Sequence, residues 1–549
     1  MSGYAPALLE TLLRLLPPPE GASAGPPLQE LISALAVALE QGELGLDLQA
    51  EAPAGVSAAD WPQQHLQSLE ASGWLVPAEA LDSRPEAPIV HDGRWLRWRR
   101  WHLQLQQCLE RLMERAASPL EPAAAATAIS AARRQAEAAG LDSQQSAAVA
   151  ALLRHRLVLL SGGPGTGKTS TVVQMLAAAL RLDGGLRLHL AAPTGKAAAR
   201  LAAAVSAGAT ELEPSLAAGL QTLPCTTLHR LLEAQGGQRF RRDSRHPLEL
   251  DLLVVDEVSM VDLPLMAALL EALPPQARLL LVGDAGQLPP VGPGAVLEEL
   301  CRPQRRQRLG EAAVELSTTY RNNGAIAAIA GQLRQQADAG EPLRWLRPAL
   351  QQLSASDNLH WHEHPLGRMP AAVLEPVQAH QRRLTALARE LPWCQGEADA
   401  EASERLLAEL EQLIVLSPIR QGSWGVEALH RQLLGAAATA PPQRWPLGTP
   451  VLNRLNRPEQ GLANGDIGVL VQRDQERLVL MAGGRLLHPA RLSGAEPALA
   501  LTVHKAQGSQ YGQVLLLLPP SRHNDPRLLY TGLTRARRQA LLVTPAEPA

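Results

Sequence analysis

The chain has 549 residues, of which 46% are hydrophobic, and its formal net charge at pH 7 is −3. This length fits three or four domains with sizeable cores, which excludes a chain that is disordered throughout. The near-neutral charge excludes a strongly basic nucleic-acid coat, although it leaves room for a local basic groove.

The four cysteines lie far apart and form no C-x-x-C pair. This spacing argues against a zinc site, a metal cluster or a disulfide framework. The first apolar stretch is interrupted by Glu10, and no run approaches the ~18 apolar residues of a membrane span. We therefore expect a soluble, cytoplasmic protein. The cysteines are Cys108, Cys225, Cys301 and Cys394.

Residues 1–118 are predicted to form a separate, mainly helical module. Helix-compatible apolar spacing runs through Ala7–Leu16 and Leu28–Leu39, and segments rich in proline and glycine separate the two. The later segment Arg94–Trp101 holds three tryptophans and four arginines. We expect it to form a strand and the start of a helix, with tryptophans inward and arginines outward. A surface for nucleic acid or a partner protein is the alternative.

From residue 119, an alanine-rich linker leads into an alternation of strands and helices that continues to the end of the chain. This alternation predicts an α/β fold with doubly wound parallel sheets. The long gap between residues 284 and 412 indicates two sheets rather than one. The predicted strands are Leu157–Leu160, Leu186–Ala191, Leu252–Val255, Leu279–Val282, Leu413–Leu416, Val514–Leu518 and Leu541–Val543.

Two insertions interrupt the alternation. Residues 233–248 are polar and rich in arginine, and they are predicted to form a short hairpin that projects from the first sheet. Residues 441–500 contain short strand-like runs between glycine and proline turns, which is typical of a small antiparallel barrel. Residues 335–412 carry no clear signal. The expected division is a module at 1–118, a first lobe at 119–312, a second lobe at 313–440 and 501–549, and the barrel at 441–500.

The segment Gly162–Thr169 fits the phosphate-binding pattern G-x-x-x-x-G-K-[ST]. A short apolar strand precedes it and a helix follows, so several backbone N–H groups converge on one point. Lys168 supplies a charge for the β- and γ-phosphates, and the Thr169 hydroxyl supplies a ligand for Mg²⁺. The sequence therefore predicts a nucleoside triphosphate site with Mg²⁺. Its residues are Gly162, Gly163, Pro164, Gly165, Thr166, Gly167, Lys168, Thr169 and Ser170.

Acidic and amide side chains follow two later strands. Asp256 and Glu257 end the predicted strand Leu252–Val255. We expect Asp256 to hold Mg²⁺ and Glu257 to polarise the attacking water. Gln287 follows the strand Leu279–Val282 and is predicted to reach the γ-phosphate. Ordinary polar strand ends are the alternative.

Two arginines, Arg321 and Arg535, suit the charge of a phosphoryl group in transfer. If both belong to the second lobe, ATP lies between two lobes and hydrolysis changes their separation. A surface arginine is the alternative for each. Thr502, His504 and Lys505 fall in a polar segment that suits a nucleic-acid backbone or a coupling element, with a solvated loop as the alternative.

Taken together, these motifs are similar to those of superfamily 1 helicases and stand in the same order. Their spellings resemble the RecD family in particular, the alpha subunits of exodeoxyribonuclease V, over roughly residues 88–549. The segments that carry the resemblance are Gly162–Thr169, Pro193–Lys196, Thr227–Leu232, Asp256–Glu257, Gly283–Gln287, Tyr320–Arg321, Asn464–Gly468, Thr502–Ser509 and Tyr530–Ala536.

The resemblance implies an ATP-dependent 5′→3′ DNA helicase with two RecA-like lobes, a pin-bearing element near residues 234–247 and an SH3-like insertion. It implies that Gln144 recognises adenine and that Thr194, Lys196 and His229 face DNA or couple to it. Arg420 falls in a family motif of the second lobe.

The resemblance also implies a complex of three subunits. The N-terminal module would dock onto a RecC-like subunit, and the nuclease site would belong to a RecB-like subunit. Such a heterotrimer processes double-stranded DNA ends for recombinational repair, and its motor also binds single-stranded DNA.

The chain departs from the family pattern at two places. Asn322 follows Arg321 where an aromatic residue is more usual, and His430 stands where the family often has asparagine. A stand-alone superfamily 1 helicase is a second hypothesis, and an ATP-gated DNA-binding protein without unwinding activity is a third. The short N-terminal part favours the complex subunit over the second. The full set of second-lobe motifs counts against the third.

Overall fold

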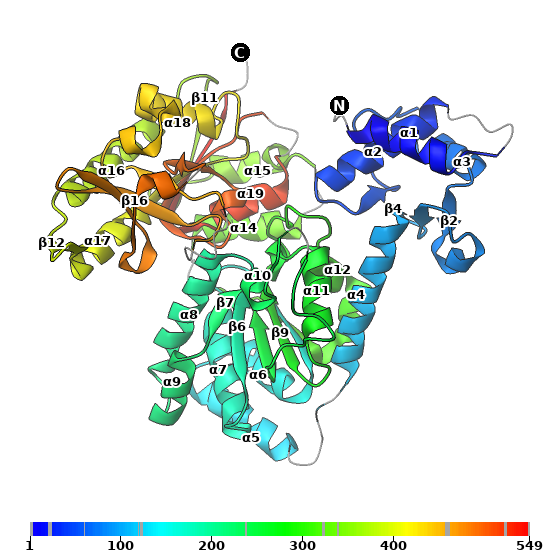
Figure 1. Ribbon diagram of the computed structural model, residues 1–549, viewed down its shortest axis with the longest axis horizontal. Helices are drawn as coiled ribbons and strands as arrows, with labels where there is room; N and C mark the ends of the chain where they lie inside the picture. The colour runs from blue at the N-terminus through cyan, green and yellow to red at the C-terminus, as the bar shows by residue number, and fades with distance from the viewer. Residues whose placement is uncertain are drawn as a thin grey trace.

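The computed structural model describes residues 4–19, 25–59, 61–118, 120, 125–236, 239–320, 324–336, 340–455, 462–492, 494–520 and 524–546. Figure 1 shows an N-terminal module, a first lobe below the centre and a second lobe with an inserted sheet at the upper left. The helices are α1 Tyr4–Leu15, α2 Pro26–Glu40, α3 Gln63–Ala71, α4 Arg99–Ala117, α5 Ala125–Ala138, α6 Ser143–Arg154, α7 Lys168–Leu182, α8 Gly195–Ala209, α9 Pro214–Gln221, α10 Leu228–Leu231, α11 Leu263–Ala272, α12 Val296–Cys301, α13 Pro303–Leu309, α14 Ala325–Gln335, α15 Pro342–Gln351, α16 Ala371–Arg389, α17 Ala400–Leu410, α18 Val426–Leu434 and α19 Pro526–Leu533.

The first lobe is built on a six-stranded parallel sheet in the order β10-β5-β9-β8-β6-β7. Its central strands are continuous apolar runs because helices cover both faces. Leu157 and Leu159 face a core that includes α4 and α11, whereas Val158 and Leu160 face α6 and α7. The strands are β5 Leu157–Gly162, β6 Leu188–Ala192, β7 Cys225–Thr227, β8 Leu252–Val255, β9 Arg278–Gly283 and β10 Ala313–Leu316.

The second lobe has a five-stranded parallel sheet in the order β11-β22-β21-β14-β20. All seven predicted strands lie in these two sheets, which confirms two α/β lobes. Because β10 pairs with β5, the first lobe extends past the boundary expected at residue 312. The strands are β11 Leu359–His364, β14 Leu413–Ser417, β20 Ala500–Thr502, β21 Tyr511–Leu517 and β22 Ala536–Pro545.

Both insertions are antiparallel, as expected. Ala234 pairs with Phe240 in a one-residue bridge, and residues 237–238 between them lie outside the described residues. The second insertion is a five-stranded sheet in the order β18-β17-β16-β15-β19, and its SH3-like character stays a prediction. Its strands are β15 Pro450–Leu452, β16 Ile467–Arg473, β17 Glu476–Leu480, β18 Leu486–Leu487 and β19 Glu496–Pro497, and a separate hairpin joins β12 Trp393–Cys394 to β13 Glu397–Ala398.

The N-terminal module combines α1 to α3 with a small four-stranded sheet in the order β1-β4-β3-β2. Figure 1 shows α4 running from this module down the side of the first lobe, where it packs against α11. The module is therefore joined to the motor by a helix that belongs to the core of the first lobe. The strands are β1 Gly45–Asp47, β2 Leu75–Pro77, β3 Ile89–His91 and β4 Trp95–Trp98.

The segment Arg94–Trp101 forms a strand and a helix start, as predicted, but the expected orientation is wrong. Arg97 is the buried residue, only 4% exposed, and it pairs with Asp92. Trp95 is half-buried, and the guanidinium groups of Arg94 and Arg97 lie 5.7 and 5.1 Å from its ring centroid. The alternation of tryptophan and arginine did not predict the orientation correctly, because the face of this strand that was expected to be exposed is covered by another part of the chain.

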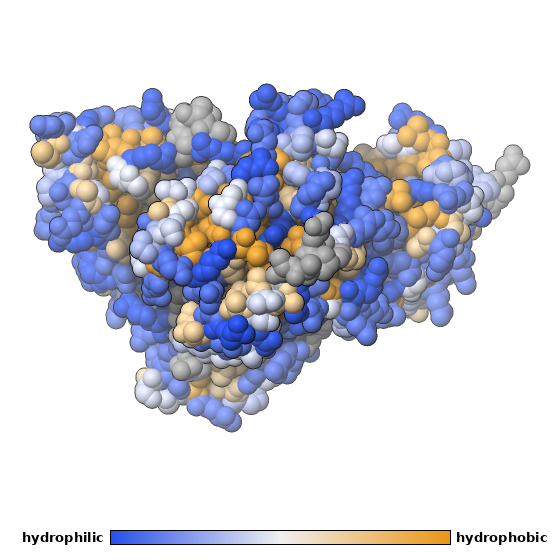
Figure 2. All heavy atoms as spheres, turned by 90° about the horizontal axis from the view of Figure 1, so that it is seen from below, coloured by the Kyte–Doolittle hydropathy of each residue, from blue (hydrophilic) through white to orange (hydrophobic). Residues whose placement is uncertain are grey.

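The molecular surface in Figure 2 is mostly hydrophilic, with apolar patches between charged regions. No helix in the described part of the chain is long and apolar enough to cross a membrane.

Candidate nucleotide site and nucleic-acid cleft

The phosphate-binding loop joins the end of β5 to the start of α7. Gly165 and Gly167 have φ angles of +77° and +80°, which favour glycine. A Cβ atom at Gly167 would lie 2.3 Å from Nε2 of Gln145. The Nζ of Lys168 donates to the carbonyl oxygens of Gly162 and Gly163, at 2.6 and 2.9 Å. The predicted loop residues thus form one tight turn with the lysine folded over it.

The segment before α6 flanks this loop. Asp142 caps α6 and forms a capping box with Gln145, and Nε2 of Gln145 donates to the Thr166 carbonyl at 3.2 Å. Gln144, the predicted adenine-reading residue, accepts hydrogen bonds from the backbone and hydroxyl of Ser317, at 2.9 and 3.0 Å. Gln144 therefore lies at the side of the loop where the chain leaves β10.

Tyr320 closes the same side of the loop. Its backbone N–H donates to the Gly165 carbonyl at 2.9 Å, and its hydroxyl donates to Asp142 at 2.7 Å. Arg321, the first predicted phosphate-sensing arginine, lies outside the described residues.

The two predicted catalytic acids follow β8. Burial and the neighbouring Glu257 carboxylate raise the pKa of Asp256 to about 6, while Lys168 and Arg200 oppose the shift. Glu257 has a φ angle of +52°, which is uncommon for a residue with a side chain and is often found at functional sites. Asp256 thus lies within electrostatic reach of Lys168 in the loop, and Glu257 within reach of Arg200 on α8.

The second lobe reaches directly into the first at this point. The Tyr530 hydroxyl, on α19, donates to Oδ2 of Asp284 at 2.7 Å, and Nε2 of Gln287 lies 3.3 Å from the same oxygen. A Cβ atom at Gly163 would lie 3.2 Å from the Tyr530 hydroxyl. Oε1 of Gln287 is buried without a hydrogen-bond partner. The predicted sensor residue thus lies beside the loop and is held by a contact between lobes.

Arg535 follows α19 and is almost fully buried, at 2% exposure. Its guanidinium donates to the carbonyl oxygens of Thr531 and Ser509, at 3.1 and 3.3 Å. Among the described residues, no carboxylate forms an ion pair with Arg535. Its charge is therefore held in place by backbone oxygens alone.

Sequence reasoning did not select Asp284, Tyr530 or Arg200 as site residues. Burial lowers the pKa of Arg200, on α8; Glu257 opposes the shift and Arg535 adds to it, so Arg200 lies within electrostatic reach of both. The one available signal was the spacing of four residues between Lys196 and Arg200, which places both on one face of a helix.

A cleft of about 1470 Å³ lies between the first lobe, the second lobe and the inserted sheet. Thr194, Lys196 and His229 line it together, and their contact with DNA stays a prediction. Thr194 caps α8, and Nζ of Lys196 lies 5.1 Å from the ring centroid of Tyr511. Burial lowers the pKa of His229, so the imidazole favours its neutral form. Asn464 lines the opposite wall.

The remaining predicted DNA contacts do not line this cleft. Lys505 pairs with Glu496 at 2.9 Å, and its backbone N–H donates to the Thr502 hydroxyl at 3.4 Å. Arg420 and Arg454 bind the same Glu496 carboxylate. These cations therefore form an ionic cluster where the inserted sheet meets the second lobe. His504 lies beside Lys505 and, like it, is absent from the cleft lining.

His430, which replaces the usual asparagine, is a buried acceptor. Its Nε2 accepts a hydrogen bond from the backbone N–H of Ala500 at 3.2 Å. Burial lowers the pKa of His430 to about 4, so the ring is neutral at pH 7. An asparagine oxygen offers the same acceptor, which explains how the two residues interchange here.

Comparisons with known proteins fit this architecture. Residues 145–293 match an AAA domain model, and residues 497–543 match the UvrD-like helicase C-terminal domain. The RecBCD enzyme subunit RecD of Mycolicibacterium smegmatis is 36% identical, over 94% of this chain and 89% of its own. The ATP-dependent RecD2 DNA helicase of Deinococcus radiodurans is 34% identical, over 72% of this chain and 48% of its own. The crystal structure of Pif1 helicase from Candida albicans is 15% identical, with a TM-score of 0.37, over 73% of this chain and 94% of its own.

Proposed function

Because the chain belongs to the RecD family of superfamily 1 helicase subunits, we propose that it is the ATP-driven 5′→3′ motor of a RecBCD-type complex that processes double-stranded DNA ends. The observation that carries this proposal is the Tyr530–Asp284 hydrogen bond beside the phosphate-binding loop. Through this contact, residues of both lobes border the proposed nucleotide site. A translocating motor requires a contact between lobes that changes when ATP is hydrolysed.

In this proposal Lys168 binds the β- and γ-phosphates, and Glu257 orients the attacking water as its general base. Arg535, together with Arg321, stabilises the charge of the transferring phosphoryl group. Gln287 senses the γ-phosphate, because its buried Oε1 and its link to Asp284 place it between the loop and the second lobe. Gln144 reads adenine from the side of the loop.

Thr169 and Asp256 are the residues that fit a Mg²⁺ ion. Both present oxygen atoms, which Mg²⁺ prefers, and a divalent cation would offset the effects of burial and of the neighbouring Glu257 carboxylate, which together raise the pKa of Asp256. The ion would neutralise phosphate charge. The chain's own part is to hold these oxygens at the end of β8 and the start of α7.

Single-stranded DNA is proposed to occupy the cleft between the lobes, with Thr194, Lys196 and His229 on one wall. Lys505, with Thr502 and His504 beside it, is proposed to reach DNA by exchanging its Glu496 partner for a phosphate. The N-terminal module is proposed to dock onto a RecC-like subunit, and the nuclease site to lie in a RecB-like subunit. The support for these partners is family membership.

Strand separation on DNA with a 5′ or a 3′ single-stranded tail tests the motor function, its direction and the site. We expect unwinding from the 5′ tail, and no hydrolysis or unwinding by Lys168→Gln, which should keep the circular dichroism and melting temperature of the parent. Unimpaired DNA-stimulated hydrolysis in Lys168→Gln would disprove the site. Hydrolysis without unwinding, with and without co-purified partners, would indicate an ATP-gated binding protein instead. Purifying the native chain shows whether two large subunits accompany it.

A further inference from the structure

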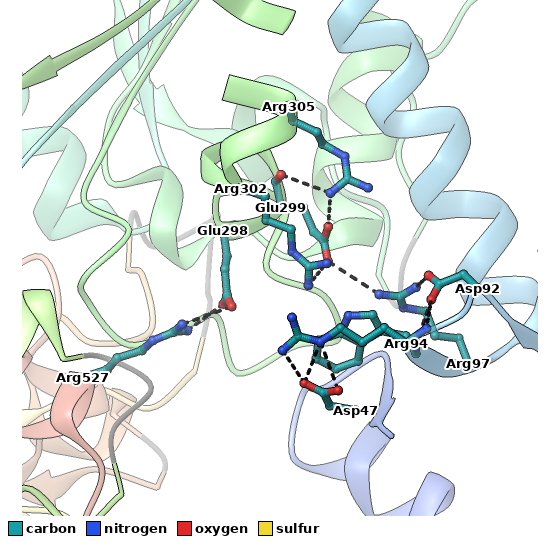
Figure 3. Close-up of polar contacts among 10 residues, drawn as sticks. Asp47, Asp92, Arg94, Arg97, Glu298, Glu299, Arg302, Arg305 and Arg527 are labelled. Atoms are coloured by element: carbon teal, nitrogen blue, oxygen red, sulfur yellow. Dashed lines mark hydrogen bonds and ion pairs between the residues drawn. The ribbon is translucent and has the colours of Figure 1, made fainter. Parts of the chain in front are cut away.

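The short helix α12 lies where the N-terminal module, the first lobe and the second lobe meet (Figure 3). Its two consecutive acids point to different bodies. Glu299 faces the N-terminal module, and Glu298 faces Arg527 at the start of α19. Nothing in the nucleotide chemistry uses either carboxylate.

Helix α12 is fixed rigidly to the strand that carries the sensor loop. Val296, Leu297 and Leu300 are buried in the core of the first lobe. A Cβ atom at Gly283, the last residue of β9, would lie 2.9 Å from Cδ2 of Leu297. The helix therefore cannot shift without disturbing the strand end next to Asp284, because packed interiors transmit displacement.

The N-terminal module holds one side of α12. Glu299 lies 3.7 Å from the buried Arg97 of β4 and also binds Arg302 and Arg305. The guanidinium of Arg302 lies 5.2 Å from the ring centroid of Trp95. The preceding loop is held as well, because the Gly294 N–H donates to the Gly42 carbonyl at 2.9 Å. Besides its ion pair with Asp92, the buried charge of Arg97 thus has a second carboxylate nearby, 202 residues away in the chain.

The second lobe holds the other side. Arg527 forms a two-pronged contact with Glu298, at 2.6 and 3.1 Å. The same helix, α19, places the Thr531 hydroxyl 2.8 Å from the backbone N–H of Leu288. Tyr530, which reaches Asp284, lies one turn after Arg527 on the same helix. The ion pair therefore holds α19 against α12, and the two hydrogen bonds hold it against the loop after β9.

The position of Arg527 is not explained by its own helix. It lies in the first turn of α19, where the helix dipole disfavours a positive charge and where Asp525 already provides the cap. Glu298, in contrast, lies in the first turn of α12, where a carboxylate is favoured. An arginine at an unfavourable helix position with a bidentate carboxylate partner indicates a specific role across the lobes.

We propose that Glu298 and Arg527 are positioning residues for ATP hydrolysis. Their ion pair sets the angle at which α19 meets the first lobe, and the N-terminal module holds Glu298 in place through Glu299. The module is then a third part of the closed motor, and a partner bound to it acts on turnover through α12. This inference rests on the proposed nucleotide site, because α19 delivers Tyr530 and Arg535 to it.

Charge reversal tests this role. In the full chain, Glu298→Arg and Arg527→Glu are each expected to lower kcat for DNA-stimulated ATP hydrolysis about tenfold, because the lobes then repel at the contact. KM for ATP should stay within about twofold, because the phosphate-binding loop is untouched. The double variant restores the pair in reverse and should recover kcat to within about threefold of the parent. If the contact were purely structural, the variants would change the melting temperature and the double variant would not recover kcat.

Arg187→Gln is the matched control. It removes a two-pronged, solvent-exposed ion pair with Asp251 inside the first lobe, away from α12, and should leave kcat unchanged. Glu299→Gln should also lower kcat, because Glu299 links α12 to the N-terminal module on the side opposite Glu298. If Glu299→Gln fails to fold because Arg97, Arg302 and Arg305 lose this carboxylate, the Glu298 variants still decide.

Two results would overturn the inference. One is wild-type kcat in Glu298→Arg, and the other is a double reversal that performs no better than the single variants. Lys168→Gln is assayed in parallel to separate this inference from the nucleotide site. If Lys168→Gln is inactive while the Glu298 variants are fully active, only the positioning role fails. If Lys168→Gln is active, the site itself is wrong.

Discussion

Arg535 is a buried cation whose contacts are backbone carbonyls, so it has no structural carboxylate to satisfy. We predict that Arg535→Ala binds a non-hydrolysable ATP analogue within a few-fold of the parent. Turnover should fall by ~10³-fold or more, as for an arginine that acts on the transferring phosphoryl group. Arg538→Ala is the control, because that arginine is exposed and donates a hydrogen bond to Gln412, away from the loop. Parallel losses in binding and turnover would make Arg535 an anchoring charge.

His430 gives the fold a defined acid sensitivity. Its folded pKa of about 4 lies below the unfolded value of roughly 6.5, so the neutral form stabilises the fold fully above pH 6.5. That contribution is lost as the pH falls from 6.5 towards 4, and at pH 5 the loss is about 2 kcal/mol. When the pH falls from 7.5 to 5, His430→Asn should lose about 2 kcal/mol less stability than the parent. Urea unfolding at the two pH values measures this difference.

The comparison variant for this test is His362→Asn, which replaces an exposed histidine of β11 and keeps the buried ring of His430. Equal acid sensitivity in the parent and in His430→Asn would show that the His430 ring is not the source.

Contacts between single residues far apart in the chain could not be predicted from the sequence. The hydrogen-bond partner of His430 lies 70 residues away, and the second carboxylate near Arg97, Glu299, lies 202 residues away. Spacing along the chain does not reveal such pairs.

At the scale of elements, the inserted sheet packs on α16 through a close backbone approach. Gly448 has a φ angle of +78°, and a Cβ atom there would lie 2.5 Å from the backbone nitrogen of Thr385. Gly448→Ala should therefore lower the free energy of unfolding by about 2–4 kcal/mol, because backbone cannot move aside. Gly494→Ala is the control, with φ at +76° and nothing within 4 Å, and should cost about 1 kcal/mol. Denaturant unfolding compares the two, and equal losses would contradict the packing argument.

The central strands were predictable and the edge strands were not. Strands β5, β8 and β9 are unbroken apolar runs because both of their faces are covered. The edge strands β10 and β11 contain Glu315 and His362 and resemble ordinary polar segments. In the nucleotide site, the loop and the acids followed from local motifs. Asp284 and Tyr530 meet only through the docking of two lobes, and so their contact was not predictable.

At the scale of the whole molecule, bound nucleotide should stabilise the second lobe as well as the lobe that carries the phosphate-binding loop. Nine of the ten tryptophans lie in the N-terminal module or in the second lobe with its inserted sheet, and only Trp101, on α4, packs against the first lobe, so tryptophan fluorescence mainly follows the module and the second lobe. An ATP analogue with Mg²⁺ at 100 times its Kd should add about 2.7 kcal/mol of stability. We predict that the fluorescence melting curve shifts with nucleotide. A shift seen only by calorimetry would mean that binding stays within the first lobe.

The chain passes from one lobe to the other just after Tyr320, beside Gln144 and the loop. We expect the lobes to rotate about this side of the proposed site, so that the contact between Tyr530 and Asp284 lies farther from the rotation axis than Gln144 does. A small rotation then moves Tyr530 and Arg535 through a larger arc than it moves the contacts around the base. We expect the lobes to open first at the phosphates, so that a spent nucleotide is released phosphate end first while its base is still bound.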